Sequence, residues 1–143
     1  MTSTVVYDGN LRTVCTHVRS GSEIETDAPV DNQGKGERFS PTDLMATALG
    51  SCMLTIMGQK ARDMEVDIKG VRIDVEKVMK ADPRRVGGIN LTFHFPETLQ
   101  VSEKQKTILE RAAHTCPMIY SIHPDIAVQV NFNWKPQMII NEV

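Results

Sequence analysis

The sequence has 143 residues, of which 41% are hydrophobic and 24% are charged, and its formal net charge is -2. This length and composition fit one folded domain over residues 1–143 and give no reason to expect extended disorder. The small negative charge and the lack of any run rich in lysine or arginine exclude nucleic acid and an anionic membrane as the main partner, so we expect a small-molecule ligand.

The sequence also predicts where the protein works and the state of its thiols. Its first residues contain no basic stretch followed by an apolar one, and no segment is long and apolar enough for a bilayer span, which predicts a cytoplasmic protein. Three cysteines, an odd number, favour reduced thiols over a framework of structural disulfides. We therefore expect any disulfide here to be transient and functional.

Short strands are predicted in the first third of the chain. They are separated by the turn residues Asp8-Gly9-Asn10 and Ser20-Gly21, which tolerate positive φ. The expected strands are residues 4–7, 11–18 and 23–26. Residues 28–38 contain two glycines, a proline and no apolar period, which predicts a long loop of the kind that often carries function.

A long helix is predicted from Ser40 to about residue 62. Ser40 can cap it, Pro41 suits its first position, and Asp43 can reach back to the cap. Apolar residues recur at three- and four-residue spacing, which predicts a buried face with Cys52 on it. That stripe contains Met45, Ala48, Leu49, Cys52, Met53 and Ile56, and Lys60 could extend it. Small residues around Cys52 would let another part of the backbone approach closely, so we expect this helix at the centre of the protein.

Two strands follow the helix. Alternation predicts a strand at 66–76 with a bulge at Gly70, a loop at 81–88, and a strand at 89–95 that pairs back antiparallel. Polar residues on the outward positions indicate that one face of this sheet is buried.

The remaining chain predicts two helices and a last strand. Ser102 and Gln105 form a second capping box, which opens a helix that ends at Cys116. Pro117 then starts a short helix to residue 122, a strand covers 126–134, and a tail covers 135–143. The order βββ-α-ββ-αα-β predicts an α+β fold with antiparallel sheets around a long central helix.

Cys52 and Cys116 are the residues that could carry redox chemistry. A single mid-helix cysteine on an apolar face is more often core filler than a nucleophile. If Cys116 caps the following helix, backbone N–H groups would stabilise its thiolate and lower its pKa; otherwise it is an ordinary helix-end residue. On inward faces of two helices the thiols could approach as an attacking and a resolving pair. We interpret Cys15 as structural or incidental.

Other side chains give weaker indications. Arg38, just before the long helix, could stabilise a thiolate or position an oxyanion, although loop arginines are usually solvated. His114 and His123 flank Cys116, so a Cys/His acyl-transfer site is a further alternative. The sequence has no CxxC or HxxxH motif and no glycine-rich phosphate loop, so we expect no metal and no nucleotide cofactor.

The chain resembles the OsmC/Ohr superfamily, which includes organic hydroperoxide resistance proteins and osmotically inducible peroxidases. The resemblance rests on residues 40–53 (SPTDLMATALGSCM) and residues 112–126 (AAHTCPMIYSIHPDI), each with one cysteine. It implies an intertwined homodimer in which Cys52 attacks the peroxide O–O bond and becomes a sulfenic acid, which Cys116 resolves as a disulfide. It also implies a dithiol reductant, such as a protein-bound dihydrolipoyl group, and no further cofactor.

One position departs from the pattern of the family. Its peroxidases have a glutamate directly after the proline of the first block, paired with an arginine, whereas this chain has Thr42 there and its acid is Asp43. Neighbouring helical positions point about 100° apart, so Asp43 need not replace that glutamate. Arg38 and Arg19 are the candidates for the arginine.

Two hypotheses follow from the sequence and the resemblance. The main one is a thiol-dependent peroxidase that reduces organic hydroperoxides in oxidative-stress defence, using Cys52, Cys116 and Arg38. The alternative is a dimeric protein on the same scaffold that binds a small apolar or electrophilic molecule without turnover.

Overall fold

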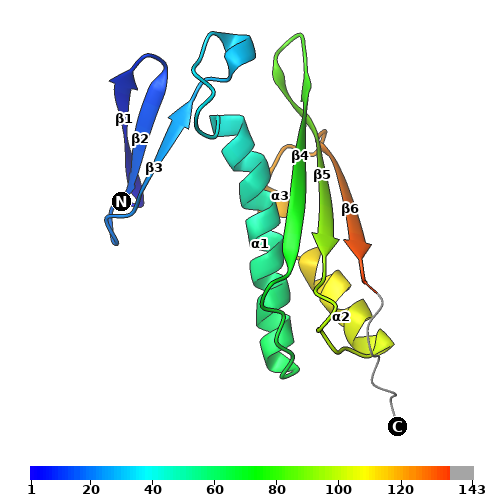
Figure 1. Ribbon diagram of the computed structural model, residues 1–143. Helices are drawn as coiled ribbons and strands as arrows, with labels where there is room; N and C mark the ends of the chain where they lie inside the picture. Colours follow the sequence, from blue (N-terminus) through cyan, green and yellow to red (C-terminus); the bar gives the residue numbers. More distant parts are fainter. Residues whose placement is uncertain (136–143) are drawn as a thin grey trace. The chain divides into compact units, whose positions relative to one another are not determined.

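A computed structural model describes residues 1–135 of the chain (Figure 1). It contains two compact units, residues 1–45 and residues 46–143. The predicted order βββ-α-ββ-αα-β is confirmed, with one added 3-10 turn at Val30–Asn32. The single domain over residues 1–143 stays a prediction, and residues 136–143 of the predicted tail lie outside the described residues.

The first unit is an antiparallel sheet in the order β1-β2-β3. Its strands are β1 (Ser3–Gly9), β2 (Arg12–His17) and β3 (Glu23–Asp27), which confirms the three predicted strands. Between β1 and β2, Asn10 and Leu11 take φ values of 54° and 62°, as a tight hairpin turn requires. Leucine is an unusual residue at positive φ, and its backbone N–H donates to Tyr7 Oη at 3.2 Å.

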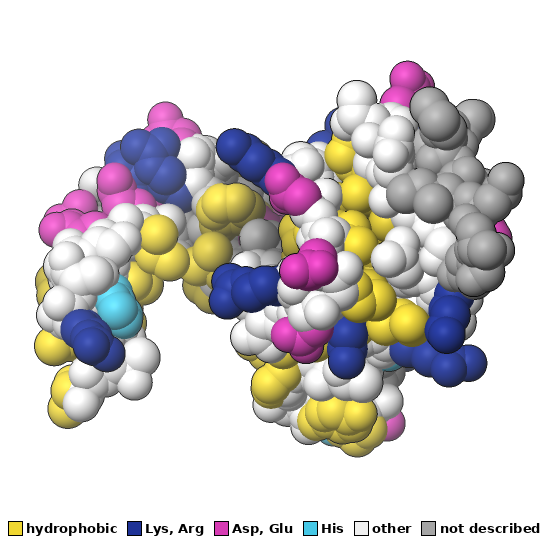
Figure 2. Space-filling model, turned by 90° about the horizontal axis from the view of Figure 1, so that it is seen from below, with side chains coloured by type: hydrophobic (Ala, Val, Ile, Leu, Met, Phe, Trp, Pro, Cys, Tyr) yellow, Lys and Arg dark blue, Asp and Glu magenta, His cyan; other side chains and the backbone are white. Residues whose placement is uncertain are grey.

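This first sheet leaves large apolar side chains exposed. Val5, Val6 and Tyr7 are each between 60% and 64% exposed. Since successive residues of a strand point to opposite faces, neither face of β1 is covered in the single chain. Hydrophobic side chains are accordingly seen at the surface of this unit (Figure 2, left). The buried residues of the unit are all polar: Thr26, Asp27 and Ser40.

The second unit contains the sheet β4-β5-β6, formed by β4 (Arg72–Lys80), β5 (Arg85–His94) and β6 (Ala127–Asn133). β4 and β5 pair antiparallel as predicted. β6 lies parallel to β5, with Leu91 opposite Val130, so the expectation of antiparallel sheets is wrong for this pair. The reason is the connection: a crossover through two helices returns the chain in the same direction, whereas a tight turn reverses it.

Three helices belong mainly to the second unit: α1 (Pro41–Asp63), α2 (Glu103–Ala113) and α3 (Pro117–Ser121). Both predicted capping boxes are confirmed. The Ser40 hydroxyl accepts the Asp43 N–H and the Asp43 carboxylate accepts the Ser40 N–H, each at 3.0 Å. Ser102 and Gln105 do the same for α2. None of the helices in residues 1–135 is both long and apolar enough to cross a membrane.

The core of the second unit lies between its helices and one face of its sheet. α1 reaches the sheet at Gly50, where an added Cβ would lie 3.3 Å from Val75 and 3.5 Å from Leu91. At the end of α2, the ring of the capping residue His114 contacts Phe132 of the sheet edge-on. Both helices therefore cover the apolar face, while Arg72, Asp74 and other polar residues occupy the opposite one. The largest side chains without exposure include Leu49, Met53, Met57, Ile89, Leu91 and Phe93.

The segment between α1 and β4 differs from the prediction. The predicted strand from residue 66 with a bulge at Gly70 is wrong, because β4 begins only at Arg72. Glu65 takes a φ of 56°, and the N–H groups of Glu65 and Val66 donate to the carbonyls of Arg62 and Ala61. This is a Schellman cap, so these residues close the helix.

The start of β5 also differs from the prediction. Its first residues fall in the predicted loop 81–88, which is shortened to the turn 81–84. Gly87 lies within β5 under the side chain of Lys80, which an added Cβ would approach to 2.3 Å. The glycines indicated a loop in the sequence, but one of them serves a close approach inside a strand.

Candidate active site

The two cysteines singled out by the sequence lie together in the second unit. Cys52 is half-buried in the middle of α1, and Cys116 is fully buried between α2 and α3. Cys52 lies close enough to Cys116 to help raise the pKa of its thiol, so the two cysteines are neighbours. Neither is in a disulfide. This proximity agrees with the predicted approach of the two helices, while the roles of the two thiols stay a prediction.

Local sequence explains how the pair forms. Gly50 lets α1 pack tightly on the sheet, and the buried stripe of the helix then runs through Leu49, Met53 and Met57. Cys52 lies beside this stripe, so it is half-buried where the sequence predicted a buried position. Pro117 ends the preceding turn and places Cys116 in extended conformation at the cap of α3, with φ of -68° and ψ of 144°.

The pKa of the Cys116 thiol differs from the prediction. Burial raises this pKa above its ordinary value, and Cys52 raises it further. The backbone N–H groups of Ile119 and Met118 lower it, but they offset only part of the effect. The predicted lowering is therefore wrong, because α3 has only five residues and the thiol is withdrawn from solvent. At neutral pH this thiol is protonated.

The histidines do not complete a Cys/His site in the described residues. His123 Nδ1 accepts the N–H of Asp125 at 3.0 Å, and the ring of His114 lies 5.9 Å from that of Phe132. His94 is held by Asp74 at 2.9 Å and by Asn133 at 3.3 Å. None of these imidazoles has a thiol among its contacts, so nothing in residues 1–135 supports the acyl-transfer alternative.

The arginine candidates belong to the first unit. Arg38 is 48% exposed, its Nε lies 3.8 Å from Glu25, and its Nη1 donates to the carbonyl of Glu37 at 3.1 Å. Arg19 is exposed in the turn between β2 and β3. Arg38 is thus held by neighbours within its own unit, whereas no contact fixes Arg19 among the described residues.

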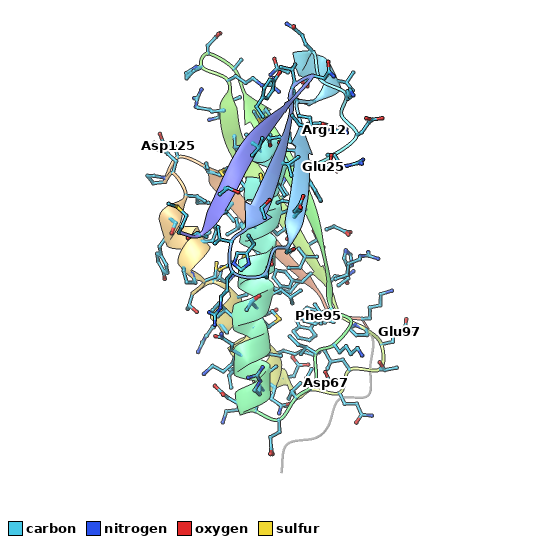
Figure 3. The ribbon with its side chains drawn as sticks, turned by 90° about the vertical axis from the view of Figure 1, so that its left-hand side faces the viewer. Arg12, Glu25, Asp67, Phe95, Glu97 and Asp125 are labelled. Carbon is cyan, nitrogen blue, oxygen red and sulfur yellow. The ribbon has the colours of Figure 1, made fainter. Side chains whose placement is uncertain are left out.

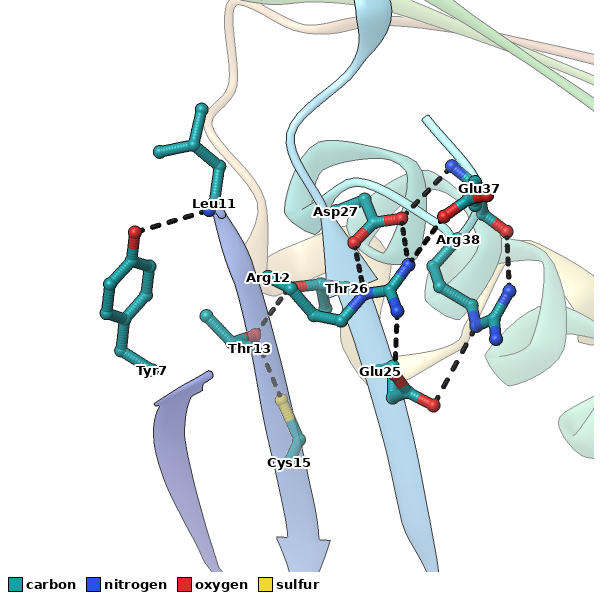
Figure 4. Close-up of polar contacts among 10 residues, drawn as sticks. All are labelled: Tyr7, Leu11, Arg12, Thr13, Cys15, Glu25, Thr26, Asp27, Glu37 and Arg38. Atoms are coloured by element: carbon teal, nitrogen blue, oxygen red, sulfur yellow. Dashed lines mark hydrogen bonds and ion pairs between the residues drawn. The ribbon is translucent and has the colours of Figure 1, made fainter. Parts of the chain in front are cut away.

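Sequence reasoning missed the most strongly held arginine of the first unit, Arg12. Its guanidinium makes a two-pronged contact with Asp27, at 2.7 and 2.9 Å, and also reaches Glu37 at 3.0 Å and Glu25 at 3.5 Å (Figure 4). Arg12 and Glu25 project from neighbouring strands of the sheet (Figure 3). We call the group Arg12, Glu25, Asp27, Glu37 and Arg38 the arginine cluster.

The arginine cluster fixes the loop between β3 and α1. The hydrogen bonds from Arg12 lower the pKa of the buried Asp27 to about 2, so its carboxylate is charged at neutral pH. Asp27 also accepts the backbone N–H of Glu37 at 3.0 Å, which ties the end of the loop to the sheet. The sequence signal for this cluster was Asp27, a charged residue at the end of the third strand. Its partner Arg12 lies fifteen residues away in the sequence, so the pair could not be read from local spacing.

The chemistry that this arrangement supports is thiol redox chemistry. Two neighbouring reduced cysteines can form a disulfide on oxidation, and one is more accessible than the other. The described residues contain no group of three or more histidine, cysteine and acidic side chains placed to hold a metal ion. A hollow of about 600 Å³ at the C-terminal end of α1 is lined by Leu54, Gly58 and Val66 among others, and no cysteine lines it.

Comparison with known proteins identifies the family. The model of the OsmC-like protein family matches residues 34–131. A protein from Psychrobacter arcticus 273-4, described as a "putative osmotic stress induced and detoxification response protein", is 56% identical. Its structure has a TM-score of 0.88, with 93% of this chain and 96% of that chain covered. A search of curated proteins found no match.

More distant structures share the fold. The organic hydroperoxide resistance protein OsmC of Legionella pneumophila is 18% identical, with a TM-score of 0.70 over 92% of this chain and 96% of that one. OhrB of Bacillus subtilis, also an organic hydroperoxide resistance protein, is 16% identical, with a TM-score of 0.63 over 93% and 98%. The chain therefore belongs to the OsmC-like protein family and has the α+β fold of the OsmC/Ohr superfamily.

Proposed function

We propose that this protein is a cytoplasmic thiol-dependent peroxidase that reduces organic hydroperoxides in oxidative-stress defence. The observation that carries the proposal is the proximity of two reduced cysteines, the half-buried Cys52 and the buried Cys116. The names of the more distant structural relatives, which are organic hydroperoxide resistance proteins, agree with it.

The proposed reaction has two steps. The Cys52 thiolate attacks the outer oxygen of the hydroperoxide, the O–O bond breaks, and the alkoxide takes a proton and leaves as the alcohol. Cys52 is then a sulfenic acid, which the Cys116 thiol attacks; the S–S bond forms and water leaves. A dithiol reductant, for which a lipoyl-bearing protein is our candidate, returns both cysteines to thiols by exchange.

The two thiols suit different roles. Cys52 is half-buried, whereas Cys116 has no exposed surface, so a hydroperoxide from solvent meets Cys52 first. The raised pKa of Cys116 keeps it a protonated thiol at neutral pH, and only a thiolate attacks a peroxide efficiently. Cys116 is therefore the resolving cysteine in this proposal, and its proton can leave with the departing hydroxide.

Arg38 is the proposed cationic partner of the Cys52 thiolate, since a guanidinium favours the charged form of a nearby thiol. Its present contact with Glu25, at 3.8 Å and largely exposed, is weak enough to open. An Arg38→Gln variant tests this role, because loss of the guanidinium should slow the reaction of Cys52 with hydroperoxide.

A homodimer is the second part of the proposal. The apolar residues of β1 are exposed on both faces, and β1 is an edge strand, so a second copy would cover surface that the single chain leaves open. Analytical ultracentrifugation should give twice the chain mass of 16.0 kDa. A Val5→Glu/Val6→Glu variant should dissociate, and a wild-type particle of one chain mass would contradict the dimer.

The mechanism is tested by treating the reduced protein with cumene hydroperoxide and mapping its cysteine peptides by mass. Wild type should yield a Cys52–Cys116 disulfide, Cys116→Ser a sulfenic acid on Cys52, and Cys52→Ser no rapid oxidation. Cys15→Ser is the matched control and should behave as wild type. Thiols that stay unmodified under excess hydroperoxide would contradict the peroxidase.

One observation favours a second function, a dimeric protein that binds an apolar or electrophilic small molecule without turnover. Thr42 stands where the peroxidases of the family have a glutamate, and the Asp43 carboxylate is engaged in the helix cap with Ser40. This candidate predicts stoichiometric ligand binding and no consumption of hydroperoxide, so the same treatment separates the two functions.

A further inference from the structure

A groove of about 500 Å³ runs between α1 and α2 in the second unit. Its floor is apolar, with Ile56 from α1 and Ile108 and Ala112 from α2. The aliphatic stems of the long side chains at its rim add to this surface. A hydrocarbon chain could therefore lie along the groove with most of its length against apolar groups.

Two residues that line the groove lie close to the cysteines along the chain, although neither cysteine is in the lining. Ile56 lies one helical turn after Cys52, and Thr115, which also lines the groove, directly precedes Cys116. At a rise of about 1.5 Å per residue, Lys60 on the rim is about 12 Å along α1 from Cys52. A ligand about 12 Å long that is anchored at Lys60 would thus extend along α1 to the level of Cys52.

The rim carries two cations that the described residues leave without partners. Lys60 of α1 and Arg111 of α2 both line the groove, and neither side chain has an ion pair or hydrogen bond within residues 1–135. Asp63 is the acidic side chain of the lining, so the groove has an excess of one positive charge. Two cations above an apolar floor complement an amphipathic anion.

We propose that this groove binds the substrate as an amphipathic carboxylate. The carboxylate lies between Lys60 and Arg111, and the hydrocarbon chain runs past Ile56 and Ile108 toward Cys52. This inference deepens the proposed function and rests on it for the oxidation step, because it makes the favoured hydroperoxide one with an acidic headgroup. Binding itself does not depend on turnover.

Binding is measured by isothermal titration with decanoate and decanol, which share a chain length but differ in charge. Wild type should bind decanoate about fivefold more tightly than decanol, as expected for two partly exposed ion pairs. Lys60→Gln/Arg111→Gln should lose that preference and keep its affinity for decanol. Arg62→Gln/Lys104→Gln removes one cation from each helix outside the groove and should match wild type.

Turnover separates this inference from the proposed function. With linoleic acid hydroperoxide, the KM of Lys60→Gln/Arg111→Gln should rise about fivefold, while its kinetics with neutral cumene hydroperoxide stay unchanged. If wild type reduces both and the variant changes neither, the groove inference is wrong and the peroxidase stands. If wild type reduces neither, the peroxidase fails; the decanoate titration then decides the groove alone, and failure to prefer decanoate overturns it.

Discussion

The two sheets of this protein are stabilised in different ways. In the second unit the sheet β4-β5-β6 has one apolar face, covered by α1 and α2, with Leu49 and Phe93 entirely buried. In the first unit the buried residues are all polar, and Arg12 and Asp27 hold the end of the sheet to the following loop. The thiol pair lies in the unit with its own core, whereas the arginine cluster lies in the unit without one.

This difference shows where rigidity comes from in each part. Packing fixes Cys116, because a buried side chain is held on all sides. Charge fixes Arg12, whose planar guanidinium has matched acceptors on Asp27. The second unit should therefore respond most to changes of volume, and the first to changes of charge.

The largest expected effect is a cavity in the second unit. Leu49→Ala removes a fully buried side chain and should lower the free energy of unfolding by about 2–5 kcal/mol. Leu54→Ala is the matched control in the same helix, where the leucine is half-buried, and should cost clearly less. Urea unfolding followed by the fluorescence of Trp134, the single tryptophan, measures both variants. Equal losses of unfolding free energy in the two would contradict the claim that core packing stabilises this unit.

Asp27→Asn should loosen the loop between β3 and α1. Because its pKa is lowered to about 2, the Asp27 carboxylate contributes stability above about pH 4, and this is lost as the pH falls toward 2. The variant should lack that pH dependence and be cleaved faster by trypsin after Lys35. The exposed Asp8→Asn is its control. Cleavage of Asp27→Asn at the wild-type rate would mean that charge does not hold the loop.

Replacing either of two glycines of α1 should change the free energy of unfolding by a smaller amount, and the two variants are best compared with each other. Gly58→Ala adds a methyl group that meets nothing within 4 Å, so the better helix former should raise the free energy of unfolding by about 0.5–1 kcal/mol. Gly50→Ala makes the same change 3.3 Å from Val75 and should lose that gain to crowding. Thermal unfolding compares them, and an equal gain at both positions would refute the close packing of α1.

The smallest expected effect is a shift in the titration of Cys116. Since Cys52 raises the pKa of Cys116, Cys52→Ser should lower it, and alkylation by iodoacetamide should begin at a lower pH. Burial still keeps the value above that of an ordinary thiol. The profile of Cys15→Ser should match wild type, and an unchanged profile in Cys52→Ser would show that the two thiols do not interact.

Much of the fold follows from local sequence signals. The capping residues Ser40 and Ser102, the alternating strands and the element order were all predictable, because each signal lies within a few residues of the structure it produces. The parallel pairing of β6 was not, since strand direction depends on the whole crossover. Val66 was misassigned because alternation cannot reveal that a Schellman cap uses the residue.

In the candidate site, too, local features could be predicted from the sequence and long-range ones could not. Cys52 and Cys116 could be named from their helix faces and the family resemblance, but the raised pKa of Cys116 reflects burial by distant residues. Arg12 was missed because its partner Asp27 is brought near by strand pairing, which the alternation of β2 does not reveal.

The most direct test of the peroxidase is a single-turnover titration of the reduced Cys15→Ser variant with one equivalent of cumene hydroperoxide. The account predicts that one equivalent is consumed, that both remaining thiols are lost, and that the intact mass falls by two hydrogens, as a Cys52–Cys116 disulfide requires. Full recovery of hydroperoxide together with two free thiols would contradict the account and leave the chain as a binding protein on the same fold.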